Sequence, residues 1–164
     1  MKKITAFSTL LIAGLLSAQE GTNVYPFLNI PVSARQAALG GDAVSIRDYD
    51  VSFVGVNPGL MNLDQDDMIA VNYASYLADS KYGTISYVKD LEEGHLIGFN
   101  ARYMDYGKMP RTDESAEING DFGAMDASLG LSYAYQFDED FTIAGGANFV
   151  TSKIDSYTSM AVVG

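Results

Sequence analysis

The chain contains no cysteine and no tryptophan, and it has one histidine among its 164 residues. The absence of cysteine excludes a disulfide framework, a zinc ribbon and a lipid-modified N-terminal cysteine. A single histidine is too few for most histidine-based metal sites. These absences remove disulfide-stabilised folds and most zinc proteins from consideration.

Positive charge is also scarce, because 10 Lys and Arg stand against 21 Asp and Glu, a net charge of -11. A chain with a pI of about 4.2 is a poor nucleic-acid binder, since phosphate contacts need Lys and Arg. Hydrophobic residues make up 48% and charged residues only 19%, which excludes a disordered chain. The length suits one folded domain. The charge predicts that nucleic acid is not a partner.

Residues 1–18 have the layout of a secretory signal peptide. Lys2 and Lys3 are followed by an uncharged, mostly apolar run from Ile4 to Leu16, and then by Ser17 and Ala18. The apolar run is too short to cross a bilayer as a helix. Cleavage after Ala18 would leave 146 of the 164 residues and, without the two lysines, eight cations against 21 acids, a net charge of -13. The sequence therefore predicts an exported protein.

Residues 19–66 are predicted to form a helical segment ahead of the strands. Ser33 can cap a short helix while Gln36 reaches back to the chain before it, and Gly40 and Gly41 can end that helix. A second start lies at 57–60, where Asn57 is the cap and Pro58 the first helical position. That second helix is expected to last about one turn.

From residue 67 to 164 the apolar period changes to two, which predicts an all-β region. The five predicted strands are 68–77, 82–89, 95–106, 124–137 and 141–152. A polar stretch, 108–121, is expected to be a long loop. One face of each strand is rich in large apolar residues, and the other face carries small and polar ones.

A soluble sandwich and an outer-membrane β-barrel both fit alternating strands. Three features favour the barrel: strands long enough for a tilted bilayer crossing, small polar residues on the second face, and aromatic residues near strand ends. The fold predicted is a transmembrane antiparallel β-barrel preceded by a short helical segment in its lumen. Five strands cannot close, because the smallest such barrels need about eight, so we expect the N-terminal part of a longer protein.

No set of residues points to catalysis. Ser86 and Lys89 match an S-x-x-K pattern, but that motif needs a helix and these two residues fall on opposite faces of a predicted strand. His95 stands alone at a strand boundary, and the acidic groups at 64–67 and 138–140 lack the spacing of a calcium loop.

Arg102 lies on the small polar face and is expected to form a structural pair with an acid such as Asp126. We therefore predict a protein that is not an enzyme and has no cofactor and no metal.

The stretches 33–41, 48–50 and 57–60 resemble the entry region of FadL-like outer-membrane barrels. The residues that carry the resemblance are Ser33, Arg35, Gly40, Gly41, Asn57, Pro58 and Leu60. Within this group the chain is most similar to the PorQ family, through 27–31, the run 72–83 and the segment 103–107 with its following residues. Gly59 stands where the group more often has Ala.

The resemblance implies a barrel of about 14 strands, within the range of such proteins, in the bacterial outer membrane. It implies a non-enzymatic component of the type IX secretion system that anchors a cell-surface attachment complex. The partners implied are a PorZ-like surface protein, a PorU-like sortase, a PorV-like barrel and outer-membrane lipid.

Three functions remain open at this point. The first is the secretion scaffold, in which the predicted loop with Thr112, Asp113 and Glu114 would lie at the partner surface. The alternatives are a FadL-like transporter of hydrophobic small molecules, which would need an apolar groove inside the barrel, and a role like that of PorV.

Overall fold

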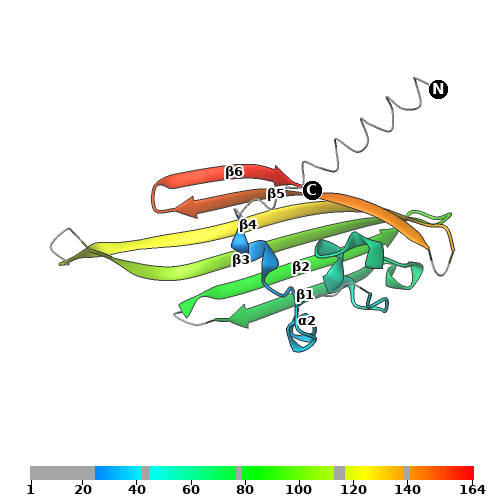
Figure 1. Ribbon diagram of the computed structural model, residues 1–164, viewed down its shortest axis with the longest axis horizontal. Coiled ribbons are helices and arrows are strands. Elements are labelled where there is room, and N and C mark those ends of the chain that lie inside the picture. Colours follow the sequence, from blue (N-terminus) through cyan, green and yellow to red (C-terminus); the bar gives the residue numbers. More distant parts are fainter. Residues whose placement is uncertain (1–24, 42–44, 77–78, 113–116, 139–140) are drawn as a thin grey trace, which may run out of the picture.

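A computed structural model gives the fold of residues 25–41, 45–76, 79–112, 117–138 and 141–164. Six strands form one antiparallel sheet in which each strand pairs with the next one along the chain (Figure 1). The strands are β1 (Met68–Ser75), β2 (Lys81–Asp90), β3 (His95–Thr112), β4 (Ile118–Gln136), β5 (Thr142–Ile154) and β6 (Tyr157–Val163). The all-β prediction is confirmed, and the predicted signal peptide lies outside the described residues.

The prediction of five strands is wrong by one, because β6 follows β5 after a two-residue turn. That turn is Asp155–Ser156, which contains no glycine and so gives a weak hairpin signal. Asp155 adopts a φ of 55°, a left-handed conformation that aspartate tolerates better than most residues. Tyr157 then pairs with Ile154, and Val163 pairs with Asn148.

The long loop predicted at 108–121 is also wrong, since β3 continues to Thr112 and β4 begins at Ile118. β2 pairs with β3 only as far as Asp105, and β5 pairs with β4 only from Ala124, so the two longest strands project beyond their neighbours as a hairpin. Pro110 is accommodated next to a shift in register, as is usual for proline in a strand with a free side. We call this the hairpin end of the sheet, and the other end the far end.

The described parts of residues 25–67, here called the N-terminal segment, contain only short helical turns. These are η1 (Pro26–Asn29), α2 (Ala34–Ala38), η2 (Val51–Gly55), η3 (Pro58–Leu60) and η4 (Leu63–Gln65). Gly40 and Gly41 have φ of 93° and 97°, which is the left-handed helix end predicted. Asn57 caps η3, because its side chain accepts a hydrogen bond from the Gly59 N–H at 3.0 Å.

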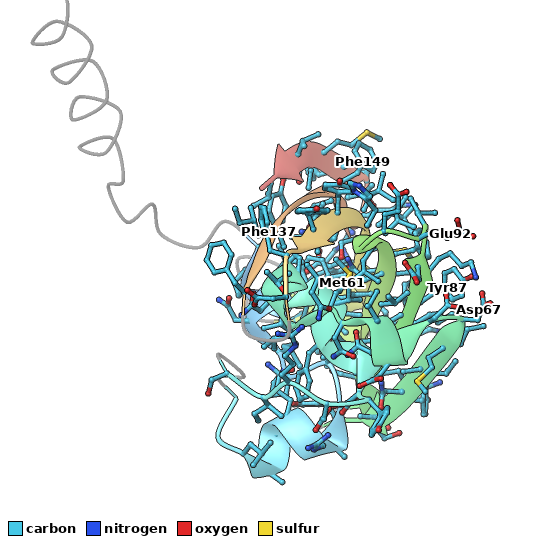
Figure 2. The ribbon with its side chains drawn as sticks, turned by 90° about the vertical axis from the view of Figure 1, so that its right-hand side faces the viewer. Met61, Asp67, Tyr87, Glu92, Phe137 and Phe149 are labelled. Carbon is cyan, nitrogen blue, oxygen red and sulfur yellow. The ribbon has the colours of Figure 1, made fainter. Side chains whose placement is uncertain are left out.

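The N-terminal segment packs against one face of the sheet, which curves around it. In Figure 2, Met61 lies inside this curve, and Tyr87 and Asp67 lie at the outer surface. Val51, Val54 and Met61 form a buried cluster with three sheet residues, Val88, Leu96 and Ala134. A second cluster joins Phe27 to Tyr82, Met104 and Val150. We call the covered face of the sheet the inner face and the opposite one the outer face.

No helix within the part of the chain that the structure describes is both long and apolar enough to span a membrane. The described strands form an open sheet, in which β1 and β6 each pair on one side only. Two of the hydrophobic clusters lie between the N-terminal segment and the inner face, and a third, Phe53 with Leu60, lies within the segment.

Candidate functional site

The outer face of the sheet is the most unusual surface of the molecule, because large apolar side chains cover it and none of the described elements covers them. Leu129, near the middle of β4, is 55% exposed. The exposed apolar residues of this face are Ile69, Val71, Tyr73, Ile85, Phe99, Tyr103, Met125, Leu129, Leu131, Tyr133, Ile143, Phe149, Met160 and Val162. Soluble monomers rarely expose a continuous apolar surface of this kind, which is typical of surfaces that contact lipid or another apolar partner.

One row of this face is apolar across all six strands. The residues that pair in register are Val71, Ile85, Ala101, Leu129, Phe149 and Val162. Beside this row Gly83 stands between Tyr73 and Tyr103, and a hollow of about 400 Å³ opens there with walls that are almost wholly apolar. The row and its hollow therefore form a mainly apolar surface, and the hydroxyl groups of Tyr73 and Tyr103 lie beside it.

Charged residues border the apolar band at both ends. Along β2 these borders are Lys81 and Lys89, eight residues apart, or about 26 Å at roughly 3.3 Å per residue. A strand tilt of about 40° reduces that height to roughly 20 Å, close to the ~25 Å apolar band of outer-membrane barrels. At the far end, aromatic rings continue the surface, with Tyr135 and Phe137 in edge contact at 4.4 Å between ring centroids.

The inner face has a mixed character, since polar side chains are as common as apolar ones among its buried residues. Arg102 is only 5% exposed. The other buried polar side chains of this face are Thr84, Ser86, Asn100, Asp126, Ser128 and Ser132. The alternation predicted from the sequence is therefore present, with the small polar side turned towards the N-terminal segment.

Arg102 joins the sheet to two separate turns of the N-terminal segment. Its two terminal nitrogens donate hydrogen bonds to the backbone carbonyl oxygens of Leu28 and Gly55. The predicted pairing with Asp126 is wrong: Asp126 lies diagonally across from Arg102 and accepts a hydrogen bond from the Tyr106 hydroxyl at 2.6 Å. Thus Arg102 clamps the N-terminal segment in place, and Asp126 braces the base of the hairpin.

Two further side chains of the inner face reinforce this attachment. The Thr84 hydroxyl donates to the carbonyl oxygen of Val32 at 2.8 Å. The Asn72 amide donates to the Ser52 hydroxyl at 3.1 Å. Because these partners are 52 and 20 residues away along the chain, the attachment is a tertiary feature rather than a local turn.

Glycine at position 98 lets the N-terminal segment approach the sheet closely. A Cβ at this position would lie 2.3 Å from a Val54 methyl and 2.6 Å from the Met61 sulfur. Both contacts are well inside van der Waals distance. The close packing of Val54 and Met61 on β3 therefore requires a residue without a side chain.

The residues of the predicted entry motif lie within the N-terminal segment and stabilise its own fold. Ser33 caps α2, and Arg35 in that helix forms an ion pair with Asp48 and a longer one, 3.7 Å, with Asp50. The Arg35 guanidinium, together with a backbone hydrogen bond from Asp50, holds the pKa of the Asp48 carboxyl below its usual range.

The second half of the motif, Asn57 to Leu60, forms η3. Leu60 is buried and packs against Phe53 of η2. The structure thus brings the motif residues together as a scaffold for the segment and places none of them in a catalytic arrangement.

Three amide side chains of the N-terminal segment form hydrogen bonds that the sequence pattern did not predict. Gln36 accepts from the Val32 N–H at 2.7 Å, one residue before the Ser33 N–H that a capping box requires, and donates to the Gly41 carbonyl oxygen. A complete capping box occurs instead at Asn62 and Gln65, whose amides also donate to the Asp48 carbonyl oxygen at 3.0 and 2.8 Å. The N-x-x-Q spacing from Asn62 to Gln65 is the sequence signal that predicts this capping box.

At the far end, Lys89 is neutralised within the chain. Its ammonium lies 3.0 Å from an Asp66 oxygen and 2.8 Å from an Asp67 oxygen. The Tyr87 hydroxyl donates to Asp67 as well, at 2.8 Å. Hydrogen bonds from Lys89 and Tyr87 keep the pKa of Asp67 below its usual range, and the Asp90 N–H and Lys89 do the same for Asp66. This acidic group, which lacks the spacing of a calcium loop, forms an exposed paired charge cluster at the border of the apolar band.

The predicted partner loop lies at the hairpin end. Thr112 is the exposed last residue of β3, and Asp113 and Glu114 lie outside the described residues. Among the residues that are described, no three histidine, aspartate or glutamate side chains are grouped so that they could hold a metal ion.

Comparison of the chain with protein-family models, with curated proteins and with solved structures found no significant match in any of the three. The function is therefore inferred from the two faces of the sheet and from the residues that border them.

Proposed function

We propose that the sheet is part of the wall of an outer-membrane β-barrel, with its outer face in lipid and the N-terminal segment inside the lumen. The observation that carries the proposal is that the sheet leaves its apolar outer face uncovered and turns the face with its buried polar side chains towards the N-terminal segment. In water, exposing this apolar surface costs a free energy of roughly 25 cal/mol per Å². In a bilayer, lipid tails solvate the same surface.

Antiparallel pairing of every strand with its sequence neighbour is the topology of such barrels. Further strands would have to pair with β1 and β6, because an open edge in hydrocarbon leaves backbone groups without partners. The projecting β3–β4 hairpin then belongs to the extracellular side, where long connections of these barrels lie, and the far end faces the periplasm.

Within this class we propose a non-enzymatic scaffold of the type IX secretion system rather than a transporter. The N-terminal segment packs on the inner face of β1 to β5, and one cavity beside it, of about 280 Å³, is lined by polar groups such as Arg102, Asn29 and Asn148. A hydrophobic substrate would find little apolar contact there. The resemblance of the entry motif to the PorQ family supports the same choice, with PorZ-like, PorU-like and PorV-like proteins as partners.

The membrane part of the proposal is tested with the full-length protein in vesicles. Protease protection of the strands and a shift in gel migration between unheated and boiled samples are expected for a closed barrel. A protein that stays in the aqueous fraction and is digested throughout would contradict the membrane assignment.

The partner part is tested by tagging the full-length protein in its native outer membrane and identifying what mild detergent extracts with it. We expect a PorZ-like protein with a PorU-like or PorV-like component, and loss of that recovery when residues 112–120 are deleted. Recovery of the barrel alone, with bound lipid or fatty acid, would favour the transporter. Unchanged recovery after the deletion would exclude the hairpin as the partner surface.

A further inference from the structure

The two borders of the apolar band differ in how their positive charges are used. At the far end the border lysine, Lys89, is bound by Asp66 and Asp67. At the hairpin end three exposed lysines, Lys81, Lys108 and Lys153, have no hydrogen-bond or ion-pair partner among the described residues. Unpaired cations at one border only are the feature that needs an explanation.

The three lysines are placed by strand register on the outer face. Lys81, Asp105, Met125 and Lys153 form one row across β2 to β5. Lys108 lies opposite Gly123, two residues beyond Met125 along β4. Lys81 and Lys153 are three strands apart, or about 14 Å at roughly 4.8 Å per strand. The three lysines are therefore spread along the border of the apolar band at the hairpin end and are not clustered at one point.

The total charge at the two ends strengthens this contrast. The strands and turns of the hairpin end carry four cations, the three lysines and Arg111, against the described acids Asp79, Asp105, Glu117, Asp121 and Asp155. The far end, with residues 64–67, carries Lys89 against Asp64, Asp66, Asp67, Asp90, Glu92, Glu93 and Asp138. With Asp113 and Glu114 between β3 and β4, and Glu139 and Asp140 between β4 and β5, the net charge is -3 at the hairpin end and -8 at the far end, so the hairpin end is the less acidic of the two.

Two of the acids near the lysines are already engaged. Asp155 forms an ion pair with Arg111. Asp105 accepts a hydrogen bond from the Gly107 N–H at 2.8 Å. No described acid forms an ion pair with the three lysine ammonium groups, but Asp105, which pairs with Lys81 in register, keeps its charge and offsets part of theirs.

We infer that Lys81, Lys108 and Lys153 bind the negatively charged phosphate headgroups of membrane lipids in the leaflet on the hairpin side. The inference rests on the proposed membrane function, since it needs the outer face to lie in lipid. Basic residues at a bilayer surface attract anionic headgroups, and flexible lysine stems let the charge reach them from the edge of the hydrocarbon. The acidic far end would repel the same headgroups, so the arrangement also fixes the orientation of the sheet.

The test uses the full-length protein reconstituted in phosphatidylcholine vesicles that contain either spin-labelled phosphatidic acid or spin-labelled phosphatidylcholine. The fraction of motionally restricted label gives the selectivity of the protein for the anionic lipid. We expect a selectivity on the order of fivefold, the effect of about one lysine at a bilayer surface, because Asp105 and Asp121 offset part of the lysine charge.

The triple variant Lys81→Gln, Lys108→Gln, Lys153→Gln should bring this selectivity close to unity. The matched control, Lys89→Gln, should leave it unchanged, because that lysine is already neutralised. Raising the salt to about 1 M, where the Debye length is about 3 Å, should lower the selectivity of the wild-type protein.

The outcomes separate the two proposals. Normal insertion with no preference for phosphatidic acid, or an equal loss in Lys89→Gln and the triple variant, overturns the lysine site and leaves the membrane function standing. Failure of the wild-type protein to insert overturns the membrane function, and the lysine site with it. Competition by soluble inorganic phosphate at constant ionic strength would assign the lysines to a free anion instead and would also overturn the lipid assignment.

Discussion

The two faces of the sheet use the same strands for opposite purposes. On β4, Leu129 and Leu131 face outwards and are more than half exposed, while the alternate residues Ser128 and Ser132 are buried. In a water-soluble sheet the apolar side would be covered and the polar side left in water. On β4, therefore, burial does not follow apolar character, and this reversal supports the proposed contact of the outer face with lipid.

The largest expected effect comes from placing a charge on the outer face. Leu129→Arg should destabilise the full-length protein in vesicles by about 2–4 kcal/mol, the cost of arginine at the midplane of a membrane barrel. Ile118→Arg is the matched control, because Ile118 is 72% exposed but lies in the projecting hairpin beyond the apolar band. Chemical denaturation in vesicles measures both, and equal, small effects would indicate that the outer face contacts water.

A change on the inner face tests the clamp between the sheet and the N-terminal segment. Arg102→Met removes two hydrogen bonds from a charged donor to partly buried carbonyl groups. Because water can replace part of each bond, the total loss should be roughly 1.5–3 kcal/mol, the value of one such bond in full. Arg111→Met removes only an exposed ion pair with Asp155 and should cost about 0–1 kcal/mol.

Limited proteolysis should cut residues 25–67 faster in the Arg102 variant than in the Arg111 variant. Equal stability and equal proteolysis of the two variants would mean that Arg102 does not hold the segment.

Glycine substitutions sharpen the comparison of the two faces. Gly98→Ala would place its methyl group against Val54 and Met61 and should cost about 1–3 kcal/mol through overpacking. Gly145→Ala on the outer face meets no heavy atom within 4 Å and should be neutral or slightly stabilising. Thermal unfolding of the two variants in detergent measures the difference, and a larger loss for Gly145→Ala would contradict the packing of the segment.

The smallest effect is expected from the Arg35–Asp48 ion pair. Because the folded pKa of Asp48 lies below its ordinary value of 3.8, the carboxylate stabilises the fold fully above that pH. This contribution is lost as the pH falls through the lower, folded pKa. The stability difference between wild type and Asp48→Asn should therefore shrink below about pH 4. In an Arg35→Gln background this pH dependence should nearly disappear, and its persistence there would assign it to another group.

Strand periodicity made the sheet and its two faces predictable, because alternation depends only on the local sequence. The hairpin around Pro110 and the final strand were missed, since proline and polar residues signal loops unless a neighbouring strand supplies register. The caps at Ser33 and Asn57 were predictable because they are contacts over two or three residues. The partners of Arg102 were not, because the carbonyl groups that it binds are 74 and 47 residues away.

The sequence by itself determined the alternation of apolar and polar residues, the helix ends at Gly40 and Gly41, and the absence of cysteine-based or multi-histidine sites. Only the tertiary structure decided that the N-terminal segment covers the polar face and that three lysines line one border of the apolar band while Lys89 is paired at the other. The physical reason is that local patterns fix the direction of each side chain relative to its own strand. Which residues meet depends on register and packing between segments that are far apart in the chain.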